Sequence, residues 1–302
     1  MTDPRRPTTI IEVPRLAQAL GLRSLTLASE TFQWTGSFKF RAAYEVASSV
    51  KQDLLIAASS GNFGQALAYA CSLLGKRSII VMPHTSASVK VKAVADYGGT
   101  VDLIDVGVVG RSKRVAQLAL EHPEAYIASA YDDPLVIRGN SSLGREIAAL
   151  SPAPEIVVTP VGGGGLASGI IVGLADANRT MDVIGAEPLL ANDAARSLRA
   201  GELLANSAEP QTLADGARTL SLGRHNWAIL RTGLASIVEV PEDKIVEAVR
   251  ILFSAANLKA EPTGALSVGA ILHDPSTFRD RRVCCIISGG NVDPALYASL
   301  LA

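Results

Sequence analysis

The sequence has little cysteine, few aromatic residues and no excess of either charge. Its 302 residues include three cysteines, which form no C-x-x-C pair and no even disulfide framework. A reducing cytoplasm therefore fits the chain, and we expect Cys71, Cys284 and Cys285 to be small buried apolar side chains. The 28 basic and 29 acidic residues leave a formal net charge of -1, which predicts no binding to nucleic acid or to an anionic membrane.

Long hydrophobic runs are also missing. No window approaches the ~18 unbroken apolar residues of a membrane-spanning helix. The segment Met1–Thr9 is polar and contains Pro4 and Pro7, so we do not expect a signal peptide. Hydrophobic residues nevertheless make up 48% of the chain and aromatic residues only 5%, a balance that favours the aliphatic core of parallel α/β folds. The length predicts two lobes or one large α/β unit.

Short β-branched runs alternate with longer helical patterns along the chain. The predicted strands are Leu54–Ala58, Ser78–Met82, Thr100–Ile104, Ala125–Ala128, Ile156–Thr159, Val183–Ala186, Ser236–Val240 and Val283–Ile287. The predicted helices are Phe63–Leu74, Ser112–His122, Leu166–Ala177, Glu242–Ala256 and Thr263–Leu272. Such alternation indicates parallel sheets with helices on both faces.

Glycine-rich turns follow three of the predicted strands. They are Ser59-Ser60-Gly61-Asn62, Gly162-Gly163-Gly164-Gly165 and Ser288-Gly289-Gly290-Asn291. Ligands of open α/β sheets bind beyond the carboxyl ends of the strands, where these turns lie. We therefore expect the three turns to form one composite site.

The four consecutive glycines favour a phosphate site. They can turn several backbone N–H groups toward an anion, and the helix that follows adds the positive end of its dipole. A flexible turn is the simpler alternative. A third interpretation is open too, because Gly162-x-Gly164-x-x-Ala167 with Glu187 downstream fits the loose dinucleotide fingerprint of a nicotinamide-dependent oxidoreductase.

A lysine between two phenylalanines is the other candidate for chemistry. Lys39 stands between Phe38 and Phe40 and follows Gly36-Ser37. It could be an ordinary lysine of an edge strand. In apolar surroundings, however, a lysine has a lowered pKa and can form an imine with an aldehyde cofactor.

In order along the chain, these segments resemble the fold-type II pyridoxal-phosphate enzymes, above all the serine/threonine dehydratase and serine racemase group. The matching runs are Gly36-Ser37-Phe38-Lys39-Phe40-Arg41, Ser59 to Ala66, Pro160 to Leu166, Ala214-Asp215-Gly216, Glu261-Pro262-Thr263 and Ser288 to Asp293. The resemblance implies a fold like the tryptophan synthase β chain, with two open, twisted, mostly parallel sheets, flanking helices and the cofactor between two lobes. It places residues 1–51 and 134–302 in a large lobe and residues 52–133 in a small one, and it implies a homodimer.

The same resemblance implies roles for single residues. Lys39 would carry pyridoxal 5'-phosphate as an imine and take the α-proton of an amino acid. Other cofactor contacts would be Phe38 beside the ring, Asn62 on the phenolic oxygen, Gly162, Gly163, Gly164, Gly165 and Leu166 on the phosphate, Gly216 along the pocket and Ser288 at the ring nitrogen. The substrate would meet Ser59, Ser60, Asn62, Phe63 and Arg111.

Two serines leave the reaction open. A hydroxyl at Ser288 would leave the ring nitrogen largely neutral, which favours β-elimination over transamination; alternatively, Ser288 only caps the next helix. Ser60 matches the serine that reprotonates the opposite face in racemases, but it could also simply bind the substrate carboxylate. Arg111 could likewise be a solvated residue at a helix start.

The run from Glu187 to Asp193 resembles the divalent-cation loop of serine racemases and related dehydratases, and this resemblance implies a metal site. Carboxylates of Glu187 and Asp193 and the carbonyl of Ala191 offer oxygen ligands, which suit magnesium or calcium. A capped surface loop is the alternative. The site would be structural and activating.

The expected activity is elimination of water and ammonia from a β-hydroxy amino acid such as L-serine or L-threonine. Phe63 stands where the group usually has histidine, so the sequence does not determine which side chain the substrate carries. The alternatives are an amino-acid racemase that uses Lys39 and Ser60, a β-replacement synthase, the oxidoreductase above, and a silent cofactor-binding protein.

Overall fold

The computed structural model of the chain describes residues 3–59, 61–86 and 88–302. In this part of the chain, the larger of two sheets has six strands in the order β1-β2-β10-β7-β8-β9, all parallel except β1. Its strands are β1 Thr9–Glu12, β2 Ser24–Ser29, β7 Ile156–Pro160, β8 Asp182–Pro188, β9 Ser236–Val240 and β10 Arg282–Ile287. The smaller sheet has four parallel strands in the order β5-β4-β3-β6 within the same described residues. These are β3 Leu54–Ala58, β4 Arg77–Pro83, β5 Thr100–Ile104 and β6 Tyr126–Ile127.

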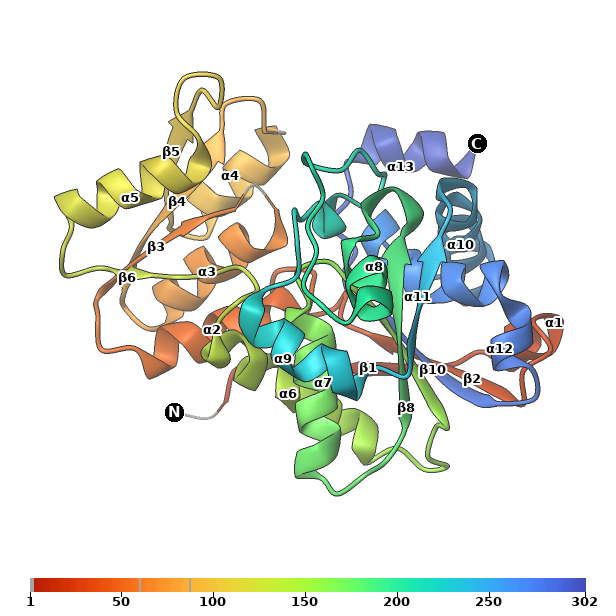
Figure 1. Cartoon of the computed structure of the whole chain (residues 1–302). Helices are drawn as coiled ribbons and strands as arrows, with labels where there is room; N and C mark the ends of the chain where they lie inside the picture. Colours follow the sequence, from red (N-terminus) through yellow and green to blue (C-terminus); the bar gives the residue numbers. More distant parts are fainter. Residues whose placement is uncertain (1–2, 60, 87) are drawn as a thin grey trace.

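Helices cover both faces of each sheet, and the two sheets lie side by side in separate lobes (Figure 1). The helices are α1 Pro14–Ala19, α2 Lys39–Ser49, α3 Asn62–Leu73, α4 Ser88–Asp96, α5 Arg111–Glu121, α6 Pro134–Ala148, α7 Gly165–Asp176, α8 Asp193–Ala200, α9 Arg224–Gly233, α10 Glu242–Ala256, α11 Pro262–His273, α12 Pro275–Phe278 and α13 Pro294–Leu301, with short 3₁₀ turns η1 Leu189–Ala191 and η2 Asp215–Ala217. No helix among the described residues is both long enough and apolar enough to cross a membrane.

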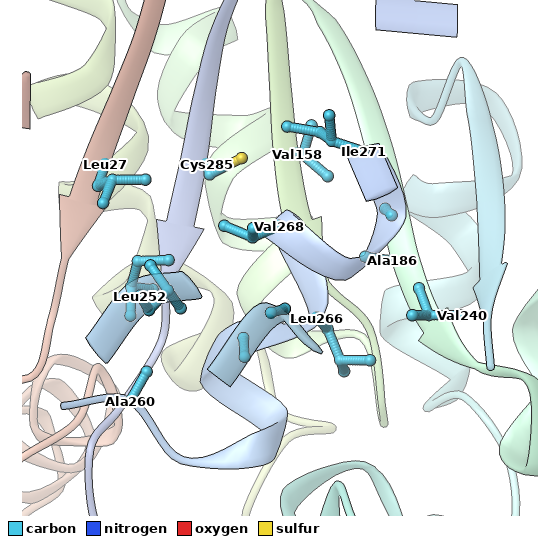
Figure 2. Close-up of a cluster of buried hydrophobic side chains, with 14 of the residues drawn as sticks. Leu27, Val158, Ala186, Val240, Leu252, Ala260, Leu266, Val268, Ile271 and Cys285 are labelled. Atoms are coloured by element: carbon cyan, nitrogen blue, oxygen red, sulfur yellow. The ribbon is translucent and has the colours of Figure 1, made fainter. Parts of the chain in front are cut away.

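Alternate residues of the central strands enter different cores, because successive side chains of a strand point to opposite faces. Val158 of β7 and Cys285 of β10 pack against α10 and α11, as Figure 2 shows. Val157 and Cys284, their neighbours in sequence, pack instead against α6, α7 and α9. The strands are therefore buried on both faces, which accounts for their continuous apolar sequence.

The predicted strands and helices are all present, with strand ends within two residues and helix ends within one. All three cysteines are free and buried, as expected. The strands of the smaller sheet fall within residues 52–133, while the exact lobe boundaries stay a prediction. The sequence pattern missed β1 and β2, because the first is a four-residue antiparallel edge strand and the second pairs with β10 at the far end of the chain.

The sequence pattern also missed α2 and α6, which pack against each other. Gly139 on α6 lies so close to α2 that a Cβ atom there would be 2.6 Å from the Arg41 carbonyl oxygen. Arg41 itself is 1% exposed and its guanidinium binds Glu30, which is fully buried, at 2.7 Å. A buried ion pair therefore anchors the first turn of α2 to the residue that follows β2.

Candidate active site

Lys39 is the first residue of α2, so it is not a lysine of an edge strand. The segment before it pairs with the loop that follows β10: the Phe38 N–H donates to the Ser288 carbonyl at 2.9 Å, and Ser37 forms a bridge to Gly289. Gly36 has a φ of +72°, and a Cβ there would lie 2.3 Å from Asn291 Oδ1. Only glycine fits this turn, which delivers the lysine to the helix start.

The amine of Lys39 lies in largely apolar surroundings. Its Nζ is 4.9 Å from the centroid of the Phe38 ring and 5.9 Å from that of Phe63, and it donates to the Ala130 carbonyl at 2.7 Å. Burial lowers the pKa of Lys39 to about 8, against a weaker opposing attraction from Glu261. A larger share of neutral, nucleophilic amine is therefore present near neutral pH than in an ordinary lysine.

The loop between β3 and α3, together with the first turn of α3, carries most of the predicted substrate contacts. Ser59 Oγ accepts from the N–H groups of Gly61 and Gly64 at 3.3 and 3.1 Å, so its hydroxyl shapes the loop. Phe63 is only 1% exposed and belongs to the core of the small lobe. Ser60, the predicted second base, lies outside the described residues.

The Asn62 side chain is held on both sides. Its Nδ2 donates to Glu261 Oε1 and its Oδ1 accepts from Asn291 Nδ2, each at 2.8 Å. Asn291 in turn donates to the Thr35 carbonyl at 2.7 Å. These hydrogen bonds join the Asn62 loop, the lysine segment and the loop after β10, so two of the three glycine-rich turns that were predicted to form one site meet here.

Glu261 received no role from the sequence pattern, although the Glu-Pro pair at the start of α11 was visible. The carboxyl group is 3% exposed, and burial together with repulsion from Asp215 raises the pKa of Glu261 to about 8. The partners Asn62 and Lys39 lie 199 and 222 residues away in sequence, so no local signal could have found the contact.

The four glycines connect β7 to α7. Gly164 has a φ of +93°, which favours glycine, and a Cβ on Gly163 would lie 2.2 Å from the ring of Tyr131. No backbone or side-chain oxygen of the described residues accepts from the N–H groups of Gly162, Gly163 or Gly164. Free N–H groups beside a helix start fit a phosphate group.

Two further residues, Gly216 and Ser288, were predicted to contact the cofactor. The Gly216 N–H donates to Thr263 Oγ1 at 2.9 Å, and the next residue, Ala217, lies against Gly162. Ser288 directly follows β10 and is 2% exposed. It does not cap the next helix, since the Asp293 side chain accepts from the first N–H groups of α13, and that alternative is wrong. The contacts of Gly216 and Ser288 with a cofactor stay predictions.

A cavity of about 640 Å³ lies beside the lysine strap, by which we mean residues 129–133 between β6 and α6. Ala130, whose carbonyl binds Lys39, lines it, as do Ala58 at the end of β3 and Leu204 and Leu222 of the large lobe. The volume lies in the usual range of small-molecule sites.

Arg111 begins α5, and its Nη2 pairs with Glu209 at 2.9 Å. Its neighbour Ser112 lines the cavity. The guanidinium is therefore near the cavity but engaged by a carboxylate, and its predicted contact with substrate stays a prediction.

The predicted metal ligands lie together at the start of α8. Glu187 is fully buried and accepts from the N–H groups of Ala194 and Ala195 at 3.0 and 2.9 Å. Asp193 is 1% exposed, and its Oδ2 has no hydrogen-bond partner among the described residues. Burial is the main cause that raises the pKa of both carboxyl groups, to about 6 for Asp193.

Two buried carboxylates, one of which has an oxygen atom without a hydrogen-bond partner, are suitable ligands for a cation. The described residues hold no group of three or more His, Cys, Asp and Glu side chains that could bind a metal, and the ligand set with the Ala191 carbonyl stays a prediction.

The sequence profile described as "Pyridoxal-phosphate dependent enzyme" matches residues 1–289. The chain belongs to this family. The cofactor is therefore pyridoxal phosphate and the dinucleotide alternative is discarded, while the contact of the glycine loop with the phosphate stays a prediction. The predicted fold-type II fold and the reaction class, elimination or racemisation dependent on pyridoxal phosphate, are confirmed.

Relatives of known activity are similar over most of their length. An L-threo-3-hydroxyaspartate ammonia-lyase of Pseudomonas sp is 35% identical over 90% of this chain and 86% of its own. The serine racemase of Mus musculus is 33% identical over 95% of this chain and 86% of its own. Among solved structures, a threonine deaminase from T.th. matches with a TM-score of 0.88 and 37% identity, over 96% of this chain and 94% of that one.

Proposed function

We propose that this enzyme is an ammonia-lyase that converts a β-hydroxy amino acid into a 2-oxo acid and ammonia. The observation that carries the proposal is the Lys39 amine, whose pKa burial lowers to about 8 and which donates a hydrogen bond to Ala130, a residue that lines the cavity. A base of this kind is neutral often enough near pH 7 to accept a proton. The ammonia-lyase and deaminase names of two relatives support the same reaction.

Each part of the site has a task in this proposal. When bound, pyridoxal phosphate supplies an electron sink that acidifies Cα of an attached amino acid. Lys39 takes the proton from Cα. The free N–H groups of Gly162, Gly163 and Gly164 hold the phosphate, and Asn62, fixed by its two side-chain partners, contacts the phenolic oxygen. A neutral Ser288 hydroxyl at the ring nitrogen keeps the sink weak, which favours prompt loss of the β-hydroxyl.

The test is release of 2-oxo acid from L-serine, L-threonine and L-threo-3-hydroxyaspartate. Lys39→Ala should abolish both the activity and the visible absorbance of the bound cofactor, whereas Lys92→Ala on the exposed face of α4 should change neither. Activity that persists in Lys39→Ala would contradict the assignment. Silence of the wild-type protein on all three substrates would contradict the substrate class.

Racemisation is the second candidate, supported by the likeness to the Mus musculus enzyme and by Ser60 in the sequence. In that case Lys39 and Ser60 exchange protons with opposite faces of Cα. Ser60→Ala should then stop the formation of D-amino acid and spare elimination from the L-substrate. Equal loss of both activities would count against two-base chemistry. Arg111 and the Ser59 loop remain the proposed contacts of the substrate.

We also propose that Glu187, Asp193 and the Ala191 carbonyl bind magnesium or calcium. The buried, unpaired Oδ2 of Asp193 supports this site. Addition of either ion should raise the melting temperature of the wild type and of the exposed control Asp96→Asn, but not of Asp193→Asn. An equal response of all three proteins would refute the site.

The assembly and the compartment are further proposals. We propose a homodimer, to be checked by light scattering at several protein concentrations. The three free, buried cysteines support a reducing compartment such as the cytoplasm, which fractionation of the source cells would test.

A further inference from the structure

The lysine strap touches both reactive parts of the site. Its Ala130 carbonyl accepts from Lys39 Nζ at 2.7 Å, and the Tyr131 ring lies directly against Gly163 of the glycine loop. The strap residues belong to neither sheet, and regular secondary structure begins only at Pro134. The Ser129 hydroxyl accepts from the N–H groups of Tyr131 and Asp132 within the strap, and side chains from other elements hold it as well.

Asn226 of α9 is one of these side chains, and it is fully buried. Its Nδ2 donates to the Tyr131 carbonyl at 2.9 Å and to the Gly163 carbonyl at 2.7 Å. A single amide group therefore uses both of its N–H bonds to join the strap to the glycine loop. The Gly223 N–H donates to the same Gly163 carbonyl at 3.0 Å.

The start of α9 is docked on the strap by a second contact. Asp132 accepts from the N–H groups of Arg224 and His225 at 3.0 and 2.9 Å. The packing is close, because a Cβ on Gly223 would lie 2.3 Å from the Asp132 carboxyl carbon. Asn226 is thus presented by a helix end whose position relative to the strap is already set.

The hydrogen bond to Gly163 controls the orientation of a peptide group. In a trans peptide the C=O and the N–H point in opposite directions, so a Gly163 carbonyl held toward α9 directs the Gly164 N–H away from it. That N–H has no acceptor among the described residues. Glycine peptides rotate more freely than others, and a rotated Gly163 carbonyl would present a negative dipole to an anion.

We propose that Asn226 is a positioning residue of the active site: it fixes the Gly163–Gly164 peptide so that the loop presents N–H groups to the cofactor phosphate, and it keeps that loop in register with the strap that contacts Lys39. The proposal rests on the cofactor site described above. In this proposal the buried Asn226 amide aligns the cofactor phosphate with the Lys39 amine.

The experiment compares the affinity of the stripped protein for pyridoxal 5'-phosphate with its affinity for pyridoxal, which lacks the phosphate. Asn226→Leu keeps the volume and removes the donors, and Asn226→Ser is a smaller polar variant in case the first does not fold. Ser267→Ala is the matched control, because it removes one buried hydrogen bond, to the Ile286 carbonyl at 3.0 Å, elsewhere in the large lobe. Thermal unfolding of each variant accompanies the titrations.

We expect at least a tenfold loss of affinity for pyridoxal 5'-phosphate in the Asn226 variants, with at most a threefold change for pyridoxal and no selective change in Ser267→Ala. Equal weakening of both ligands would overturn the proposal, because it would mean a general packing role. Unchanged affinity for the phosphate form would overturn it as well. The titrations need no turnover, so failure of the proposed lyase activity would be seen separately.

Discussion

The pH at which Lys39 becomes able to bind the cofactor should lie far below that of an ordinary lysine. Only the neutral amine attacks an aldehyde, and burial lowers the pKa of Lys39 from 10.5 to about 8. At pH 7 the neutral fraction is then about 9%, against about 0.03% for a lysine in water. The lowered pKa of Lys39 favours the reaction, because an amine with a lower pKa has a larger neutral fraction at neutral pH. The expected gain in the fraction of neutral amine at pH 7 is about 300-fold.

The assay is the rate at which pyridoxal 5'-phosphate enters the stripped protein, followed by visible absorbance between pH 6 and pH 11. The rate should rise to half its plateau near pH 8. A blocked lysine in the same buffers serves as the reference and should reach half its plateau at about 10.4. If the protein and the free lysine share one midpoint, the apolar surroundings of the amine do not depress its pKa and the reasoning is refuted.

Two substitutions probe the support of the site. Arg41→Met should lower the free energy of unfolding by about 3–5 kcal/mol in urea, because it leaves the buried Glu30 without its partner; the double variant with Glu30→Met should recover part of this loss, and a single variant within 1 kcal/mol of wild type would contradict the buried charge pair. Gly163→Ala should weaken pyridoxal 5'-phosphate binding at least tenfold, because the new methyl would lie 2.2 Å from the Tyr131 ring and must displace the loop. Unchanged affinity in titrations of this variant would show that the loop tolerates the shift.

The stability loss of Arg41→Met should also depend on pH, because Glu30 can take up a proton. Burial raises the pKa of Glu30 even with Arg41 present. Without the guanidinium, the raised pKa should climb further, so the carboxyl group takes up a proton more readily on folding. The stability deficit of Arg41→Met should then shrink as the pH falls, since protonation removes the unpaired charge.

The central strands and the glycine turns were predictable because their signals are local. Buried parallel strands such as Ile156–Pro160 are apolar throughout, whatever lies next to them. The lysine, asparagine and glycine motifs keep fixed residues at fixed spacing, and their order along the chain indicated the family. The helices with strong apolar runs, such as Glu242–Ala256, were predictable for the same reason.

The helix that carries the reactive lysine was not predictable from the same signals. The segment Lys39–Ser49 mixes charged, small and aromatic residues and has no helix-capping side chain at its start. It is helical because α6 packs against it and because the Arg41–Glu30 ion pair anchors its first turn. The edge strand Thr9–Glu12 is likewise stabilised by its pairing with Ser24–Ser29 rather than by its own sequence.

The sequence by itself determined the family and the cofactor, because these depend on short motifs. Only the tertiary structure decided how those motifs are held. The Ala130 carbonyl meets Lys39 across 91 residues, and Asn226 reaches Gly163 across 63. Hydrogen bonds and desolvation act over a few ångströms of space and leave no mark on neighbouring residues in the chain. The pKa of the lysine and the direction of the glycine N–H groups are therefore properties of the folded protein.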